Sequence, residues 1–342
     1  MRAFVKFGTQ AGEAGVREIA PPEPGPGEAL LRVAACGICG SDVHAFNADP
    51  GFEWVKPPIT LGHEFSGTVE SVGSDVSGVE PGDRVVAVAI QGCGLCDLCA
   101  EGSTQLCAER VALGLSRDGG MAGYTSVPAK GLVPVPEDLD LKTAALGEPL
   151  AVAGHAVGVR GEVREGQSVV VSGPGPIGVM CAMLARSRRA EVLLTGVGPD
   201  TEARLPAAER AGIPTANLSD APLEDHLRRR FGERGPEVWI ESSGSVRALD
   251  SAIKAVRPGG RVVVVGLYAQ KMAFFPTDSV RREIGLVFSY SCNLADYTAA
   301  LGALASGDLD PAPMLSEFPL TDASAAFEEV RRGRAVKALL VP

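Results

Sequence analysis

Three separated segments of the chain carry side chains that bind metals and perform catalysis. The first is residues 36–44, which read CGICGSDVH; the second holds His63 and Glu64, and the third holds Glu148. Together with Cys36 they offer a thiolate, an imidazole and two carboxylates. This ligand set suits a catalytic zinc ion, which three protein groups hold while a further position stays exchangeable. Because the segments are far apart in sequence, they can meet only if the chain folds back on itself.

A second set of metal-binding residues lies within residues 93–107. Four of the eight cysteines occur there, with spacings of two, two and seven residues: Cys93, Cys96, Cys99 and Cys107. Four thiolates can surround one tetrahedral zinc ion and leave no open position, so we interpret this lobe as a structural zinc site. Its folding should be coupled to metal binding. Four reduced thiols without a metal are the alternative, which the density of cysteines disfavours.

Length and composition limit the class of protein. A chain of 342 residues is long enough for two domains. Its net charge of −10, with no offsetting basic run, argues against a nucleic-acid or membrane-surface partner. The N-terminus has no signal-peptide pattern, and no apolar run reaches the roughly 18 residues of a membrane-spanning helix. We therefore expect a cytoplasmic protein. A reducing compartment fits cysteines that are spaced for metal binding and not for disulfides.

The elements that must position these residues change in character along the chain. Short strand-like segments with glycine and proline turns, at 2–7, 28–34, 65–72 and 83–89, predict a β-rich, barrel-like first domain. After about residue 150, strands alternate with helices, beginning with the apolar strand 168–172. This alternation predicts a doubly wound parallel sheet, and the fold class that we expect is α/β.

A glycine-rich loop follows that strand. Residues 173–178, which read GPGPIG, come between the strand and a helical run at 179–188. In this context the pattern predicts a dinucleotide-binding loop, because its glycines let the backbone approach a pyrophosphate and the helix N-terminus favours the negative charge. A tight strand-to-helix turn without a ligand is the alternative.

The sequence resembles the zinc-containing medium-chain alcohol dehydrogenases, especially the branch of sorbitol (polyol), butanediol and threonine dehydrogenases. The resemblance covers nearly the whole chain and is carried, in the family's order, by residues 36–44, residues 62–67 with Gly73 and Val76, the four-cysteine lobe, residues 148–150 and residues 173–178. It implies a GroES-like catalytic domain over 1–150, with the structural-zinc lobe at 93–107. A Rossmann dinucleotide-binding domain over 151–287 and a return to the catalytic domain over 288–342 complete the expected organisation.

The resemblance also implies the ligands of the catalytic zinc. In the polyol branch these correspond to Cys36, His63 and Glu64, with Glu148 as a second carboxylate that binds directly or through water. Cys39 matches a position that is not a ligand in this interpretation. The zinc would polarise the substrate hydroxyl and lower its pKa before a hydride passes to the nicotinamide.

Further catalytic residues follow from the same resemblance. Ser41 matches the residue that hydrogen-bonds the substrate oxygen, and His44 matches the next member of a proton relay to solvent. Asp42 is expected to orient a metal ligand. Taken alone, Ser41 would be a turn or cap serine and His44 a structural histidine.

The implied cofactors are two zinc ions per chain and NAD or NADP. NAD-using relatives carry an acid at the end of the second Rossmann strand, where this chain has Gly196, followed by Asp200 and Arg204. The missing acid favours acceptance of NADP, and we expect Gly196→Asp to shift the preference towards NAD. The expected cofactor-binding residues are Gly173, Gly175, Pro176, Ile177, Gly178, Gly196, Arg204, Val265, Gly266, Leu267, Ser289 and Tyr290.

The expected function is hydride transfer between a small secondary alcohol or polyol and NAD(P). Ser289 stands where the polyol enzymes have an arginine, and Phe46, Phe52 and Trp54 either line the substrate cleft or belong to the core. A threonine-type amino-alcohol dehydrogenase shares the same ligands. A non-catalytic, zinc-stabilised dinucleotide-binding protein and a nucleic-acid-binding zinc protein are rivals of other classes. By analogy, we expect a homotetramer or homodimer.

Overall fold

The computed structural model describes residues 1–342, which form two compact units. Unit 1 consists of Met1–Ala151, Cys292–Gly307 and Leu315–Pro342. Unit 2 consists of Val152–Ser291 and Asp308–Met314.

This division differs from the boundaries expected from the sequence near the C-terminus. Residues 308–314 group with unit 2, whereas the expectation assigned all of 288–342 to the catalytic domain. The physical reason is that the turn η6 (Ala312–Met314) packs on helix α6 (Arg204–Arg210), where Arg210 Nη2 donates a hydrogen bond to the Pro313 carbonyl at 3.4 Å.

Unit 1 is built on sheets that are antiparallel except for its last two strands, which pair parallel to each other. Its strands are β1 (Arg2–Lys6), β2 (Ala14–Glu18), β3 (Glu28–Gly37), β4 (Ile59–Thr60), β5 (Glu64–Val72), β6 (Arg84–Ala87), β7 (Ile90–Gln91), β8 (Val111–Ala112), β9 (Tyr124–Pro128), β10 (Leu132–Pro134), β17 (Leu315–Pro319) and β18 (Lys337–Val341). The main sheet has the order β10-β6-β5-β3-β18-β17, with β9 also paired to β3, and the smaller sheets are β2-β1-β4 and β7-β8. The β-rich first domain expected from the short strands is therefore present.

Short helices connect and cover these strands. They are α1 (Gly40–Asn47), α2 (Asp97–Ala100), α3 (Leu141–Ala144), α4 (Gly147–Gly154), α10 (Leu294–Ala305) and α11 (Ala323–Arg331). Apolar residues alternate along β3, and its inward side chains pack with aromatic rings such as Phe4, which stacks on Phe327 of α11 at 4.8 Å between ring centroids. The core of unit 1 thus joins the two ends of the chain.

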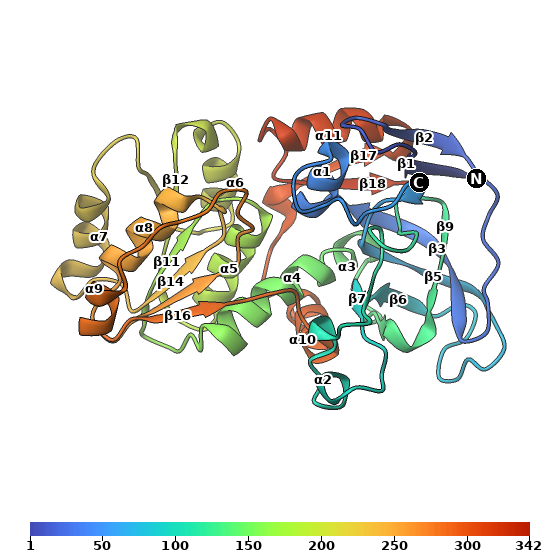
Figure 1. Cartoon of the computed structure of the whole chain (residues 1–342), viewed down its shortest axis with the longest axis horizontal. Helices are drawn as coiled ribbons and strands as arrows, with labels where there is room; N and C mark the ends of the chain where they lie inside the picture. Colours follow the sequence, from blue (N-terminus) through green and yellow to red (C-terminus); the bar gives the residue numbers. More distant parts are fainter. The chain divides into compact units, whose positions relative to one another are not determined.

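The C-terminal strand β18 lies in the middle of the main sheet. It pairs antiparallel with β3, so that Leu340 lies opposite Cys36, and Figure 1 shows this red strand beside the blue N-terminal strands. Residues from the last ten positions of the chain are consequently brought next to the segment that carries CGICGSDVH.

Unit 2 contains a six-stranded parallel sheet of order β13-β12-β11-β14-β15-β16. Its strands are β11 (Ser168–Ser172), β12 (Glu191–Gly196), β13 (Thr215–Asn217), β14 (Val238–Glu241), β15 (Arg261–Val264) and β16 (Gly285–Phe288). All residues of β11 are buried, as expected for a central strand that helices cover on both faces. The strand order reverses between β11 and β14, which is the doubly wound arrangement of dinucleotide-binding folds.

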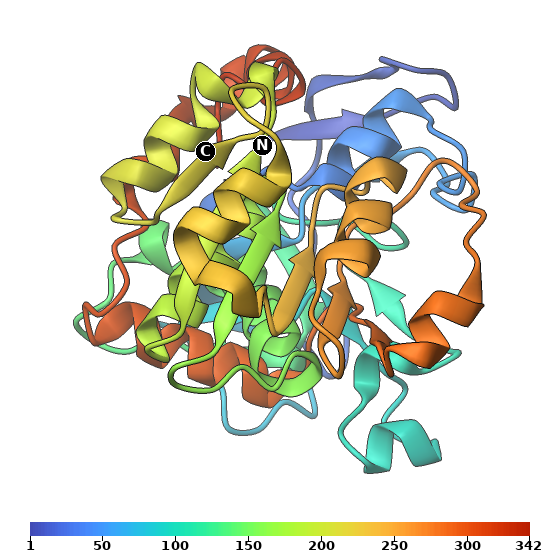
Figure 2. The same ribbon diagram turned by 90° about the vertical axis from the view of Figure 1, so that its left-hand side faces the viewer.

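The helices of unit 2 are α5 (Pro176–Ser187), α6 (Arg204–Arg210), α7 (Leu223–Phe231), α8 (Val246–Ala255) and α9 (Pro276–Arg281), preceded by the π-helical turn η3 (His155–Arg160). Figure 2 shows the parallel strands of this unit with helices packed against them. Helix α5 contacts β11, β12 and β14, and α8 contacts β14 and β15. The predicted α/β fold class is confirmed.

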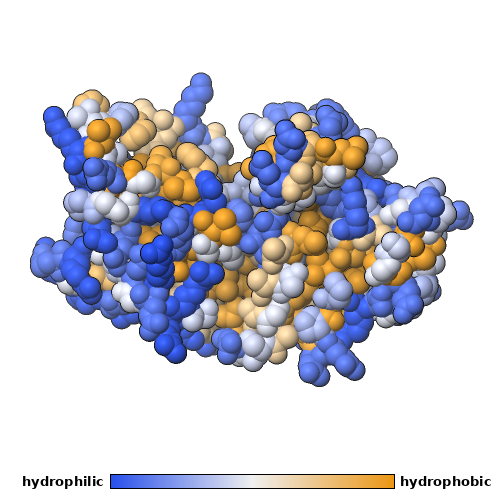
Figure 3. Space-filling view, turned by 90° about the horizontal axis from the view of Figure 1, so that it is seen from below, coloured by the Kyte–Doolittle hydropathy of each residue, from blue (hydrophilic) through white to orange (hydrophobic).

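The surface is mixed in character. Figure 3 shows hydrophobic residues exposed among hydrophilic ones on the face seen from below. No helix combines the length and the apolar character that crossing a membrane requires.

Candidate active site

Helix α1 positions the reactive run of residues. Cys39 is its N-cap residue, and the Asp42 carboxylate accepts a hydrogen bond from the Cys39 backbone N–H at 2.9 Å. A carboxylate at this position satisfies a backbone donor that a helix start leaves without an intrahelical partner. The cap therefore fixes the direction in which Cys39 and Ser41 leave the backbone.

The structure brings Cys39, His63 and Glu64 together. The Cys39 sulfur, an imidazole nitrogen of His63 and a carboxylate oxygen of Glu64 all lie within 4.8 Å of one another. Cys36, which the sequence interpretation assigned as the thiolate ligand, is not a member of this group. The thiol that the structure brings next to His63 and Glu64 is therefore that of Cys39, and not that of the expected Cys36.

The burial of Cys36 explains why its thiol lies outside this group. Cys36 lies on β3 within the apolar core of unit 1 and has no exposed surface. Its sulfur packs against Gly62, where an added Cβ would lie only 2.6 Å from it. Burial, together with Asp42 and Glu64, raises the pKa of the Cys36 thiol well above its ordinary value. Cys36 is therefore a neutral packing residue, and the chain must turn at Gly37 before a cysteine can face the site.

His63 is oriented by Asp42. Asp42 is fully buried, its Oδ1 accepts a hydrogen bond from the Gly62 N–H at 3.2 Å, and the same oxygen lies 3.4 Å from His63 Nδ1. On the other side of the ring, His63 Nε2 lies 3.3 Å from Ser41 Oγ. Burial alone would lower the pKa of His63, but Asp42 and Cys39 outweigh it and raise the pKa well above its ordinary value. Asp42 thus fixes which nitrogen faces the site.

Glu64 shares its carboxylate with a buried lysine that the sequence analysis missed. Lys337 Nζ contacts Glu64 Oε2 and also donates to the Ile38 carbonyl at 3.1 Å. Burial alone would lower the pKa of Lys337, but Glu64 and its neighbours keep the pKa above its ordinary value. Lys337 lies at the start of β18, so the nearest sequence signal was a single lysine in an otherwise apolar strand.

Glu148 lies in the first turn of α4 and is 7% exposed. Burial raises its pKa to about 7, and the neighbouring Glu64 carboxylate adds to the shift while His63 and Lys337 oppose it. Glu148 is not a member of the group formed by Cys39, His63 and Glu64, although the charges of His63 and Glu64 affect its pKa. His44, three positions after Ser41 on α1, is 39% exposed and its Nδ1 lies 2.7 Å from Asp49 Oδ2. The pKa of about 7 lets the Glu148 carboxyl exchange a proton near neutral pH, and the His44 ring is held by Asp49.

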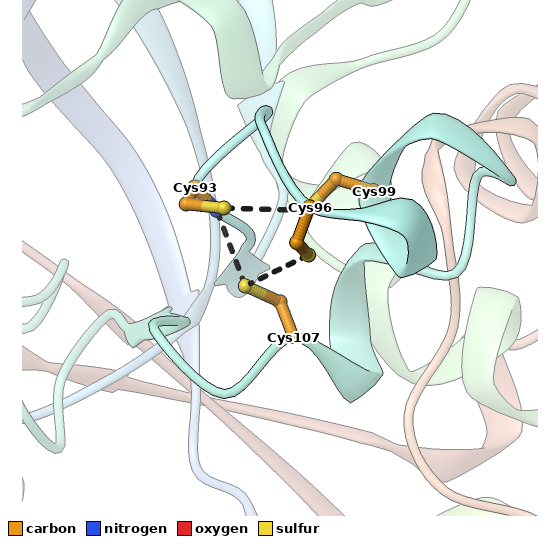
Figure 4. Close-up of side chains that lie close together, drawn as sticks. All are labelled: Cys93, Cys96, Cys99 and Cys107. Carbon is orange, nitrogen blue, oxygen red and sulfur yellow. Dashed lines mark hydrogen bonds between the residues drawn. The ribbon is translucent and has the colours of Figure 1, made fainter.

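The four cysteines of the lobe converge on one point (Figure 4). The sulfur atoms of Cys93, Cys96, Cys99 and Cys107 all lie within 4.8 Å of one another, and no disulfide joins them. Backbone N–H groups point at the sulfurs; Cys93 Sγ accepts from Leu95 N–H at 3.3 Å. Hydrogen bonds from Leu95 and Cys96 lower the pKa of Cys93 to about 6. The pKa of Cys96, by contrast, is raised to about 11, so protonation does not favour one form across the cluster. The convergence of four sulfurs without a disulfide is what fits a closed zinc site.

The glycine loop of unit 2 fits a pyrophosphate. Gly173 has a φ of +95° and Gly178 would place a Cβ 1.9 Å from the Gly173 carbonyl, so both glycines serve the tight turn and the packing of α5. Gly175, the N-cap residue of α5, has a φ of −71° and an added Cβ would meet nothing within 4 Å. Since neither strain nor packing requires glycine there, the open space in front of α5 suits a ligand that approaches the backbone closely. Pro176 and Ile177 form the first turn of the helix.

The other expected cofactor residues lie at the carboxyl ends of the parallel strands. Val265 and Gly266 follow β15 and donate to the Glu241 carbonyl at 2.8 and 3.0 Å, and Leu267 is 59% exposed. Ser289 and Tyr290 follow β16. Ligands of open parallel sheets bind outside this edge.

The sequence analysis also missed Glu241 at this edge. Its buried carboxylate accepts hydrogen bonds from the Ser243 N–H at 2.8 Å and from the Tyr268 hydroxyl. No local motif distinguishes it from any other acid at a strand end. Glu241 thereby orders the loop that packs against Gly173.

The space beside Gly196, after β12, is already occupied by neighbouring side chains. An added Cβ would lie 3.0 Å from Leu205 Cδ2 and 3.1 Å from Asp200 Oδ2. Asp200 turns back here, accepts a hydrogen bond from the Val197 N–H at 3.0 Å and pairs with Arg204 Nη1 at 3.2 Å. A carboxylate from the next turn therefore occupies the space that an acid at position 196 would fill.

Comparisons with known proteins identify the family. Residues 25–137 match the model of the alcohol dehydrogenase GroES-like domain, and residues 176–306 match the model of the zinc-binding dehydrogenases. A sorbitol dehydrogenase of Halalkalibacterium halodurans is 34% identical over 100% of this chain and 99% of its own length. The chain belongs to the zinc-containing medium-chain alcohol dehydrogenases. As a member of this family it is an oxidoreductase that acts on a CH–OH group, with zinc and NAD or NADP as cofactors.

Other relatives of this dehydrogenase include enzymes that are named for different substrates. An L-threonine 3-dehydrogenase of Streptomyces avermitilis is 34% identical over 99% of both chains. Among solved structures, a zinc-binding dehydrogenase from Sinorhizobium meliloti bound to NADP is 32% identical and covers 100% of this chain and 99% of its own, with a TM-score of 0.90. The GroES-like and Rossmann-type assignments are confirmed by these matches.

Proposed function

We propose that this dehydrogenase oxidises a secondary hydroxyl of a polyol and reduces NAD or NADP, or runs the same reaction in reverse. The observation that carries the proposal is the convergence of Cys39, His63 and Glu64 beside Ser41. A donor set of one thiolate, one imidazole and one carboxylate fits a zinc ion that must keep a position open for substrate.

The proposed catalytic zinc is held by Cys39, His63 and Glu64, with Glu148 proposed as a second carboxylate that binds directly or through water. When bound, the zinc supplies a Lewis acid that lowers the pKa of a substrate hydroxyl. Asp42 holds the His63 ring, and Lys337 holds one oxygen of Glu64, so that two of the three ligands are oriented by buried charges. The second zinc is proposed for Cys93, Cys96, Cys99 and Cys107, where it stabilises the lobe.

Proton movement is assigned to residues of helix α1. Ser41 Oγ, the hydroxyl group next to the proposed ligand His63, accepts the proton of the substrate hydroxyl while it releases its own proton towards His44. His44 lies about one helical turn further on and is partly exposed, so its imidazole can pass a proton to solvent. Asp49 orients the His44 ring through Nδ1. Glu148, whose pKa of about 7 allows either protonation state, is the proposed second proton-exchanging group.

We propose that unit 1 is the catalytic domain and unit 2 the dinucleotide-binding domain. The proposed pyrophosphate site is the N-terminus of α5 with Gly173, Gly175 and Gly178, and a bound dinucleotide would supply the hydride acceptor. Val265, Gly266, Leu267, Ser289 and Tyr290 are proposed to complete the site along the carboxyl edge of the sheet. Support comes from the open space at Gly175.

NADP is the proposed cofactor of first choice. The ribose end of the site lies after β12, where residue 196 is a glycine and Arg204 pairs with the Asp200 carboxylate at 3.2 Å, so a 2′-phosphate would compete with Asp200 for the guanidinium. An acid at position 196 would repel a 2′-phosphate, and a guanidinium would bind one.

A threonine-type dehydrogenase is the second candidate, because a threonine dehydrogenase is as similar to this chain as a sorbitol dehydrogenase. A non-catalytic dinucleotide-binding protein is disfavoured by the intact cluster of ligands.

The proposed assembly is a homodimer or homotetramer in the cytoplasm. Strand β16 is an edge strand of the sheet, and Phe288 at its end is 64% exposed. Exposed edge strands that end in large apolar residues are sites where a second chain can pair.

The experiment that tests the function is an oxidation screen. Purified, zinc-loaded enzyme is given open-chain polyols, 2,3-butanediol and L-threonine, each with NAD and with NADP, and reduced cofactor is measured. The proposal expects the highest kcat/KM with a polyol. Turnover of threonine alone would select the second candidate, and a complete lack of turnover would favour the non-catalytic one.

A further inference from the structure

Glu241 is a buried carboxylate at the carboxyl end of β14, and the groups that hold it are neutral. Its Oε1 accepts hydrogen bonds from the Ser243 N–H at 2.8 Å and from the Ser243 hydroxyl. Its Oε2 accepts from the Gly244 N–H at 3.2 Å and from the Tyr268 hydroxyl. Glu241 has no exposed surface. Because burying a carboxylate costs free energy unless its oxygens accept hydrogen bonds, these donors are needed to keep the charge in place.

Tyr268 ties a second loop to the same carboxylate. It lies in the loop after β15 (residues 265–275), and its ring packs against the core of the parallel sheet. The N–H groups of Val265 and Gly266 donate to the Glu241 carbonyl at 2.8 and 3.0 Å, so the backbone and the side chain of one residue both hold this loop. Burial and the neighbouring Glu241 carboxylate raise the pKa of the Tyr268 hydroxyl. The phenol therefore stays protonated and can donate to Glu241.

The loop after β14 (residues 242–245) touches the loop after β15 on one side and the glycine loop on the other. Gly244 has a φ of +67°, and a Cβ added there would lie 2.3 Å from the Leu267 carbonyl oxygen. A Cβ added to Gly173 would lie 2.8 Å from the Ser243 Cα. Since these backbones pack closely, the position of the loop after β15 relative to the glycine loop depends on the group that ties it to the loop after β14.

The order of the strands assigns the loop after β15 to one half of the cofactor. A doubly wound sheet consists of two mononucleotide-binding halves, and a dinucleotide crosses between them where the strand order reverses, here between β11 and β14. The ribose of the adenosine is recognised after the second strand, β12, so the adenosine belongs to the half formed by β11, β12 and β13. The half formed by β14, β15 and β16 is left for the nicotinamide mononucleotide.

We propose that Glu241 and Tyr268 are positioning residues for the nicotinamide half of the cofactor. Their hydrogen bond fixes residues 265–267, which are proposed to bind the cofactor, at one distance from the glycine loop. The pair acts through the backbone and does not touch the cofactor itself. This inference rests on the proposed assignment of unit 2 to dinucleotide binding. A pair that only stabilised the fold would affect both halves of the cofactor equally, whereas a positioning pair affects the nicotinamide half alone.

The test compares a whole dinucleotide with its adenosine half. In Tyr268→Phe, the Kd for NADPH, measured by titration of the purified enzyme, should rise by about tenfold, as expected when a hydrogen bond to a charged group is lost. The Kd for 2′,5′-ADP, which carries only the adenosine half, should change by less than about twofold. NADH and ADP repeat the comparison without the 2′-phosphate. Equal weakening of both members of a pair of ligands, or no weakening of either, would overturn the proposal.

Ser168→Ala is the matched control in the same sheet. The Ser168 hydroxyl is buried at the opposite, amino end of β11 and donates to the Gly235 carbonyl at 3.0 Å. This variant also loses a hydroxyl hydrogen bond, so it should lower the midpoint of unfolding while both Kd values stay within about twofold of the unmodified enzyme. A selective loss of NADPH affinity in Ser168→Ala as well would show that general loosening of the sheet is the cause, and the positioning role would then be rejected.

A double-variant cycle tests the role of the charge. Glu241→Gln keeps an acceptor oxygen in a side chain of the same size but removes the charge that strengthens the bond to Tyr268. In this background the effect of Tyr268→Phe on the Kd for NADPH should shrink to about threefold or less. An undiminished effect would mean that the Tyr268 hydroxyl acts without Glu241, which would reject the pair.

The same titrations separate this inference from the proposed reaction. A selective loss of NADPH affinity in Tyr268→Phe, in an enzyme that oxidises none of the alcohols, would uphold the positioning pair and reject the proposed function. Oxidation of a polyol by an enzyme in which Tyr268→Phe weakens NADPH and 2′,5′-ADP equally would uphold the function and reject the pair.

Discussion

Lys337 and Glu64 form a buried ion pair across 273 positions of sequence, with both side chains 1% exposed. Lys337 opens the last strand of the chain, β18, whereas Glu64 opens β5 next to His63. The pairing of β18 with β3 brings the lysine to this place. The C-terminal strand therefore supplies the charge that holds a proposed metal ligand.

We expect Lys337→Met to lower both stability and activity. Without the ammonium group, the Glu64 carboxylate stays buried and unpaired, which costs about 3–5 kcal/mol. Chemical denaturation measures this loss, and the catalytic zinc content and kcat/KM should fall with it because Glu64 is no longer oriented.

The double variant Glu64→Gln with Lys337→Met is the matched control. It removes both charges, so much of the stability should return while activity stays low. If the double variant were as unstable as the single one, packing of the lysine stem rather than its charge would be the important factor.

Cys39→Ser and Cys36→Ser should behave differently. Loss of the Cys39 thiolate should leave one zinc per chain and reduce kcat/KM by about a thousandfold or more, since the Lewis acid supplies several kcal/mol. Cys36→Ser should keep both zinc ions and lose about 1–3 kcal/mol of stability, because it buries a hydroxyl in the core. Metal analysis and steady-state kinetics on both variants check this; the reverse pattern would restore Cys36 as the ligand.

The two zinc ions should differ in lability. The proposed catalytic site keeps an exchangeable position, whereas the four sulfurs of the lobe form a closed site. A mild chelator should therefore remove activity and one zinc before circular dichroism reports any unfolding, and added zinc should restore activity. Simultaneous loss of both ions and of the fold would contradict the assignment of separate roles.

Cofactor preference should depend on Arg204. Arg204→Ala should lower kcat/KM with NADP by about tenfold and leave the value with NAD nearly unchanged, equivalent to about 1.4 kcal/mol for the lost phosphate contact. The ratio of the two efficiencies, before and after substitution, is the measurement. A hundredfold preference for NAD in the unmodified enzyme would instead indicate that Asp200 binds the ribose hydroxyls.

The substitution Gly196→Asp is a poorer test than the sequence suggested. Its Cβ would lie 3.0 Å from Leu205 Cδ2 and from Pro174 Cγ, and 3.1 Å from the Asp200 carboxylate. Steric crowding and like-charge repulsion should therefore disturb the loop. We expect weaker binding of both cofactors in this variant, measured by titration.

Stability should depend on pH through Glu28. Burial alone would raise the pKa of this carboxyl, but hydrogen bonds from Arg117, Ser126 and the Gly25 N–H outweigh it and leave the pKa below its ordinary value. The stabilisation is therefore present above the unfolded-state pKa of about 4.3 and is lost as pH falls through the lower folded-state value. Glu28→Gln should cost about 1 kcal/mol at pH 7 and less as the pH falls below about 4. Urea unfolding at several pH values measures this; a difference that is constant with pH would exclude the charge as the cause.

The sequence by itself determined the elements and the chemistry that depend on local pattern. The four cysteines of residues 93–107 could be assigned to one metal because their spacing confines them to one lobe. The buried strand before residues 173–178 was predicted with the observed bounds of β11, Ser168–Ser172, because a run of valines between glycine-rich turns has few other structures. In both cases the information lies within about twenty residues.

Only the tertiary structure decided which side chains meet across long separations. Cys36 and Cys39 are both followed by glycine, and only the path of β3 into α1 buries the first and turns the second towards His63. Lys337 was not foreseen, since nothing near it reveals that β18 pairs with β3. Asp200 occupies the space beside Gly196 because a turn folds back after β12. Local propensity is encoded in neighbouring residues, whereas these contacts depend on strand order and on which atoms fill the remaining space.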